Sequence, residues 1–116
     1  PARTEYSLTP AGEAEFQSWL SRLIDHPRDF RHDFMARVYF LLRHQPEKLP
    51  DLIGQQLVVA RRWLSKTVEK ESALSRPPTF ENLTYHFRVS QIESMVEWLV
   101  WLEEQAPNFI SRRGEQ

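Results

Sequence analysis

The sequence predicts an all-α protein with four helices, of which the last two are long and antiparallel, preceded by one short strand. Three observations support this prediction. Apolar residues recur at helical spacing along most of the 116 residues. Segments that contain proline interrupt this spacing at a few places, where helices must end. Two of the intervals between these breaks are several turns longer than an average helix.

The N-terminal segment combines an extended stretch with the start of the first helix. In this stretch Tyr6 and Leu8 point one way while Glu5 and Ser7 point the other, which is the period-two pattern of a half-buried strand. Thr9 can cap the free amides of a first helical turn, and Pro10 suits the first helical position because its missing N–H is not needed there. The first helix is therefore expected at residues 10–24, ending before Pro27.

Two further helices follow in the middle of the chain. From Phe30 onward the apolar residues fall on one arc of a helix, and Pro46 ends it. Residues 47–74 are expected to form one long third helix with a continuous apolar stripe. Pro77 and Pro78 then remove two backbone donors and force extended backbone, so the chain must break before the last helix.

The last helix, expected at residues 80–105, has two apolar stripes in its first half. One stripe contains Phe80, Leu83 and Phe87, and both stripes merge into a broad apolar surface at residues 95–102. A helix that is apolar over most of its circumference must be buried on more than one side, so we expect a homodimer. Its interface is expected to combine the second stripe with part of the first helix, at Trp19, Tyr85, Val89, Ile92, Val96 and Val100.

Composition limits the classes of function. With 41% hydrophobic and 27% charged residues, the chain can form one domain with a core. Its formal net charge of -1 lacks the basic excess of a domain that holds nucleic acid by itself. There is no cysteine, which excludes disulfides and thiolate chemistry. The longest nearly apolar stretch is far shorter than the roughly 20 residues that span a bilayer, and no signal peptide opens the chain, so a soluble, cytoplasmic protein is expected.

Residue patterns for catalysis or metal binding are absent from the sequence. The four histidines have no spacing typical of metal ligands, and there is neither a nucleophile elbow nor a phosphate-binding glycine loop. We therefore expect no enzyme activity, no metal and no cofactor. Trp98 and Trp101 could line a pocket for a small planar aromatic effector, although core or dimer packing is the simpler interpretation.

Several short motifs resemble one family of DNA-binding proteins. The segment Y-S-L-T followed by a glycine and by W-L resembles the last wing strand and the next helix of PadR-type transcriptional regulators, through Tyr6, Ser7, Leu8, Thr9, Gly12, Trp19 and Leu20. The segments D-F-x-x-x-F-M-A-R-V-Y-F from Asp29, E-K-L-P-D-L-I after Pro46 and E-W-L-x-W-L-E near the C-terminus resemble the helical C-terminal domain of the longer PadR-type regulators.

This resemblance implies a dimerisation and effector-sensing domain of a DNA-binding transcriptional regulator. It implies that residues 1–9 end a winged-helix domain, that residues 10–110 form the helical domain, and that residues 111–116 are a disordered tail. Because the chain opens on Pro1 within the wing, we expect a fragment that lacks the DNA-recognition helix. Arg3, in the wing, could contact a DNA phosphate. A free-standing helical protein–protein interaction module is the alternative, because periodicity alone fits it too.

Overall fold

The structure is a computed structural model that describes residues 8–74 and 79–113. Within these residues it is helical and contains no strand, which confirms the all-α prediction. The strand predicted in residues 1–9 lies outside the described ranges, except for Leu8 and Thr9, which adopt no regular structure. The elements are α1 (Pro10–Ser21), η1 (Pro27–Asp29), α2 (Phe30–His44), η2 (Pro46–Lys48), α3 (Leu49–Ser72) and α4 (Phe80–Arg113), where η denotes a short 3-10 helix.

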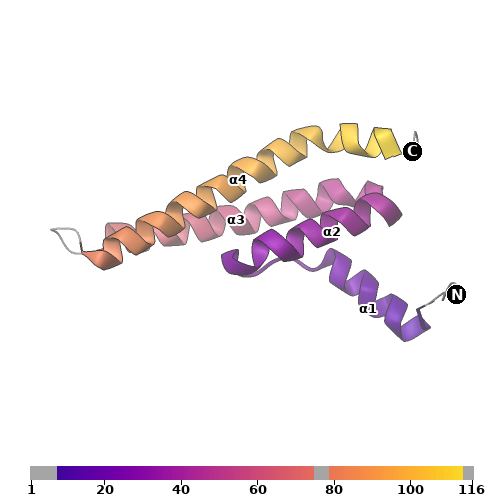
Figure 1. Cartoon of the computed structure of the whole chain (residues 1–116), viewed down its shortest axis with the longest axis horizontal. Coiled ribbons are helices and arrows are strands. Elements are labelled where there is room, and N and C mark those ends of the chain that lie inside the picture. Colours follow the sequence, from indigo (N-terminus) through magenta and orange to yellow (C-terminus); the bar gives the residue numbers. More distant parts are fainter. Residues whose placement is uncertain (1–7, 75–78, 114–116) are drawn as a thin grey trace, which may run out of the picture.

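The molecule is elongated, with extents of 65 × 29 × 27 Å. Figure 1 shows α3 and α4 lying side by side along the long axis, while α2 covers them at one end only and α1 leaves that end. We call residues 64–74 and 79–94, which extend beyond α2, the arm, and residues 22–63 and 95–113 the body. None of the helices in the described ranges combines the length and the apolar character needed to cross a membrane.

The first helix begins as predicted but ends earlier. The Thr9 hydroxyl accepts a hydrogen bond from the Gly12 N–H at 2.9 Å, and Pro10 occupies the first turn. The helix ends at Ser21 instead of residue 24, and Arg22 is already extended. The reason is tertiary: Gln56 of α3 pairs with both backbone polar groups of Ile24, at 2.8 and 3.0 Å, so these groups need no helical partners.

The other helix boundaries also differ from the predictions, most of all at the end of the last helix. The third helix begins at Leu49 because residues 46–48 form the 3-10 helix η2 instead of an α-helical turn. The last helix continues well past residue 105, although Pro107 lies within it and removes one helical donor. Ala106, on that last part of α4, is buried in the core, so packing against the body compensates for the lost hydrogen bond.

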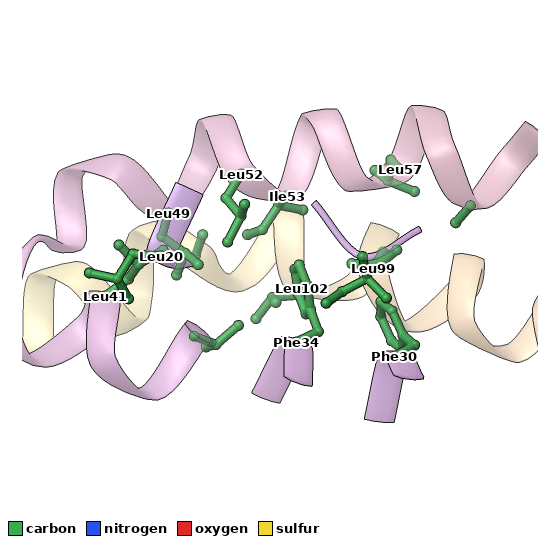
Figure 2. Packing of buried hydrophobic residues seen from close by; sticks show 14 residues of the cluster. Leu20, Phe30, Phe34, Leu41, Leu49, Leu52, Ile53, Leu57, Leu99 and Leu102 are labelled. Atoms are coloured by element: carbon green, nitrogen blue, oxygen red, sulfur yellow. The ribbon is translucent and has the colours of Figure 1, made fainter. Parts of the chain in front are cut away.

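The hydrophobic core lies in the body, where all four helices meet. Leu20 and Leu41 lie beside Leu49 at one end of it, and Phe30 lies beside Leu99 at the other (Figure 2). The buried residues of α3 all come from its N-terminal half. The core cluster consists of Leu20, Ile24, Phe30, Phe34, Val38, Leu41, Leu49, Leu52, Ile53, Leu57, Ala60, Leu99, Leu102 and Ala106.

Candidate functional site

The C-terminal end of α1 is fixed to α2 by a buried arginine. The Nε of Arg37 donates to the backbone carbonyl of Trp19 at 3.0 Å, and its Nη1 donates to the carbonyl of Asp33 at 2.8 Å. The guanidinium also lies 4.7 Å from the Trp19 ring centroid, as a cation–π contact. Burial lowers the pKa of Arg37, while the Asp33 carboxylate raises it. Arginine nevertheless stays charged in proteins, and a cation near the C-terminus of α1 is favourable for the helix dipole.

The segment after α1 is fixed to α3 in the same way. Gln56 is fully buried, and its amide satisfies both the N–H and the carbonyl of Ile24. Trp63 Nε1 donates to the carbonyl of Asp25 at 3.0 Å. Residues 22–25 therefore run extended along α3, with their backbone held by side chains of a helix more than 30 residues away in sequence. Together with Arg37, these contacts set the direction in which α1 leaves the body.

Trp19, which we expected in a dimer interface, already has aromatic neighbours within its own chain. Its ring stacks on Phe16, with centroids 6.0 Å apart, and meets Phe40 edge to face at 5.9 Å. Trp19 is only partly buried in this cluster between α1 and α2. Its ring is therefore already contacted by Phe16, Phe40 and Arg37 of its own chain.

The stripe of α4 that was expected to be exposed on a single chain is largely covered. Val89 and Ile92 are buried, with 7% and 3% of their surface accessible, and Tyr85, Val96 and Val100 are half-buried. The physical reason is that α3 packs along this side of α4. This corrects the premise that the second stripe leaves an apolar patch on the monomer.

The stripe that is exposed is the other one. Phe80, Leu83 and Phe87, which we call the arm stripe, have 83%, 67% and 53% of their surface accessible. They lie on the arm, where α2 does not reach. Contiguous large apolar side chains on the surface of a soluble protein are unusual and commonly mark an interaction site. The arm stripe is therefore the candidate contact surface of the described chain.

Trp98 and Trp101, the proposed effector residues, have different neighbours. The Trp98 ring packs edge to face against Phe30 and Phe34, at 6.0 and 6.1 Å, and is half-buried in the body. Trp101 is exposed and contacts Phe109 at 6.3 Å. Trp101 therefore has a free face, whereas Trp98 belongs to the packing between α2 and α4.

A cavity of about 480 Å³ lies between the last turns of α1 and α2 and the first turns of α3. This cavity could not be predicted from the sequence, because periodicity assigns faces to helices but does not show where their ends fail to meet. Neither Trp98 nor Trp101 lines it. Its walls are Gln17, Ser18, Leu20, Ser21, Leu41, Gln45, Lys48, Asp51, Leu52 and Gln55.

The remaining polar side chains form few clusters. Across residues 8–74 and 79–113, no three His, Asp or Glu side chains lie close enough together to hold a metal ion. His86 Nδ1 lies 3.0 Å from Glu71 Oε1 and links the start of α4 to the end of α3. Arg3 lies outside the described residues. Its expected contact with DNA phosphate therefore stays a prediction.

Comparison with known proteins relates most of the chain to a transcriptional regulator. The chain is similar to the negative transcriptional regulator PadR of Bacillus subtilis (strain 168), at 29% identity over 104 residues, covering 84% of this chain. It spans 57% of the length of that relative. No family model matches the sequence, and no solved structure matches it. The similarity extends over most of the chain and supports a distant relationship to PadR-type transcriptional regulators.

Proposed function

We propose that the chain is the dimerisation and effector-sensing part of a PadR-like DNA-binding transcriptional regulator. The observation that carries this proposal is the similarity to PadR over most of the chain. In this proposal residues 1–9 complete a winged-helix domain that reads DNA, and residues 10–110 hold two such domains in a homodimer. The chain itself catalyses no reaction.

In this regulator α1 acts as a rigid strut between the DNA-reading domain and the body. Arg37 holds the last turn of α1, and Gln56 and Trp63 hold the segment after it. Two-fold DNA sites require two recognition helices at a fixed separation. A strut fixed by side chains from two different helices satisfies this requirement, because its direction relative to the body cannot change without breaking buried hydrogen bonds.

We propose that the antiparallel pair α3 and α4 dimerises through the arm stripe. Burying Phe80, Leu83 and Phe87 would contribute roughly 1.5–3 kcal/mol each before the cost of association. The half-buried residues of the expected interface, Trp19, Tyr85, Val96 and Val100, stay in the proposal. Val89 and Ile92 instead support the arm from within its own chain, because they are already buried.

The effector-sensing role is proposed for the region around Trp101. Its exposed ring offers a flat apolar face to a small planar aromatic molecule. Trp98, one turn earlier on α4, packs on Phe30 and Phe34 and so holds this part of α4 against α2. A ligand there changes DNA binding only if it prefers one arrangement of the two subunits.

Light scattering tests the dimer that this proposal needs. At micromolar concentration the chain is expected to show about twice its mass of 13.8 kDa. The double variant Leu83→Glu with Phe87→Glu should halve that mass and keep the helical circular dichroism, because both side chains are exposed on a single chain. The matched control is Met35→Glu with Tyr39→Glu, at the same spacing and similar exposure on α2, and it should stay dimeric.

Two outcomes would contradict the proposal in different ways. A monomeric unmodified chain would remove the dimerisation function and favour a helical module that binds another protein. A double variant that remains dimeric would move the interface away from the arm stripe.

A further inference from the structure

The cavity between α1, α2 and α3 has an apolar floor and a polar rim. Its deepest lining residues are Leu20, Leu41 and Leu52, which are buried and apolar and which we call the leucine floor. Figure 2 shows Leu20 and Leu41 together at this end of the core. At about 480 Å³ the cavity is within the size range of sites for small molecules. A small molecule with an apolar part would therefore fit it.

The rim of the cavity carries one positive and one negative side chain. Lys48 ends η2 and Asp51 lies in the first turn of α3, three residues later. In helical backbone, residues three apart share a face, with Cβ atoms about 5–6 Å apart. Within the part of the chain that the structure describes, neither side chain belongs to an ion pair. Both charges are thus available to a ligand.

A third polar group at the cavity lacks a partner. Gln45 lines the cavity, and its Oε1 is buried without any hydrogen bond to the described residues. A buried acceptor without a donor is destabilising, and most such groups in folded proteins are paired. The Gln45 amide can turn toward the cavity without breaking a hydrogen bond to Oε1, because Oε1 accepts none from the described residues. A ligand that brings a donor to it would satisfy this group.

We propose that this cavity binds a small zwitterion with an apolar body, of the chemical class of the apolar amino acids. The carboxylate of the ligand pairs with Lys48, its ammonium group pairs with Asp51 and can donate to Gln45, and its side chain packs on the leucine floor. A simple carboxylic acid fits less well, because it leaves Asp51 facing a second negative charge. This site does not include the arm stripe, and it requires neither dimerisation nor DNA binding.

Three related compounds test the proposal on the full 116-residue chain: L-phenylalanine, 3-phenylpropanoate, which lacks the amine, and 2-phenylethylamine, which lacks the carboxylate. Titration followed by amide and methyl NMR shifts should show saturable binding of L-phenylalanine, with the largest shifts at Leu20, Leu41 and Leu52. Each analogue should bind on the order of tenfold more weakly, because each loses one charge-assisted contact.

Variants at the rim separate the two charge contacts. Lys48→Ala should weaken L-phenylalanine and 3-phenylpropanoate but leave 2-phenylethylamine unchanged, and Asp51→Ala should weaken L-phenylalanine and 2-phenylethylamine. The control Glu47→Ala changes an exposed neighbour that does not line the cavity, and it should change none of the three affinities.

Three results would overturn the proposal. The first is no saturable binding of L-phenylalanine up to about 10 mM, because a dissociation constant above that concentration would not indicate a specific site. The second is equal binding of the acid and the amino acid. The third is a set of shifts centred on Trp101 instead of the cavity. A monomeric chain would contradict the proposed function but leave each of these measurements valid.

Discussion

The body and the arm present the same face of α4 to different surroundings. In the body, Trp98 packs against Phe30 and Phe34 of α2. About three helical turns earlier, Phe87 lies on the same face and is exposed. The cause is the length of α2, which begins at Phe30 and does not extend along the arm. The apolar face of α4 is therefore longer than the helix that covers it, and the remainder of this face is exposed in the arm.

Polar contacts are also more buried in the body than in the arm. In the body, Gln56 and Arg37 are buried and bond to backbone groups of other elements. In the arm, the cross-helix polar pair is His86 with Glu71, and the His86 side chain is mostly exposed. Buried hydrogen bonds contribute more to a unique structure than solvated pairs do. We therefore expect substitutions in the body to be more costly than substitutions in the arm.

The largest effect is expected from removing a core aromatic ring in the body. Phe34→Ala should lower the free energy of unfolding by about 3–5 kcal/mol, because Phe34 is fully buried and its loss leaves a cavity. Leu83→Ala in the arm, measured at a concentration that keeps the chain monomeric, should change it by less than about 0.5 kcal/mol. Urea denaturation measures both. Similar losses in the two variants would mean that the arm stripe is as well packed as the core.

A smaller effect is expected from removing the clamp on residues 22–25. Gln56→Leu keeps the approximate volume of the side chain but leaves the N–H and the carbonyl of Ile24 without partners. This should lower the free energy of unfolding by about 2–3 kcal/mol. Hydrogen exchange at the Ile24 amide should become faster in the variant. Gln55→Leu, at the exposed neighbouring position, provides the control. An unchanged exchange rate at Ile24 would show that the clamp does not hold this segment.

The smallest effect is expected in the arm. Glu71→Ala removes the contact with His86 and should lower the free energy of unfolding by less than about 1 kcal/mol, because the His86 side chain is mostly exposed. Thermal unfolding at pH 7 is a sufficient measurement, with Glu69→Ala, exposed two positions earlier on α3, as the control. If Glu71→Ala lowered the free energy of unfolding as much as Gln56→Leu, polar contacts in the arm would be as important for stability as those in the body.

The sequence by itself determined the helical content and most helix starts. Thr9 with Pro10, Pro27 and Pro46 lie at the boundaries expected from the rules for caps and for missing backbone donors. These rules are local, because a cap or a proline acts on amides within its own turn. The end of α1 was predicted three residues too late, because the groups that end it belong to Gln56, which is remote in sequence.

Only the tertiary structure decided which stripe of α4 is buried. The sequence distinguishes the stripe of Val89 and Ile92 from the arm stripe, but both are equally apolar at helical spacing. Burial depends on which neighbouring helix runs beside each face and over what length. Helix α3 covers the first stripe along the arm, whereas α2 does not extend along the arm and leaves the second stripe exposed. The cavity beside Gln45 was also decided by the tertiary structure. It depends on how far apart the ends of three helices lie, and the residue pattern within one helix contains no information on that distance.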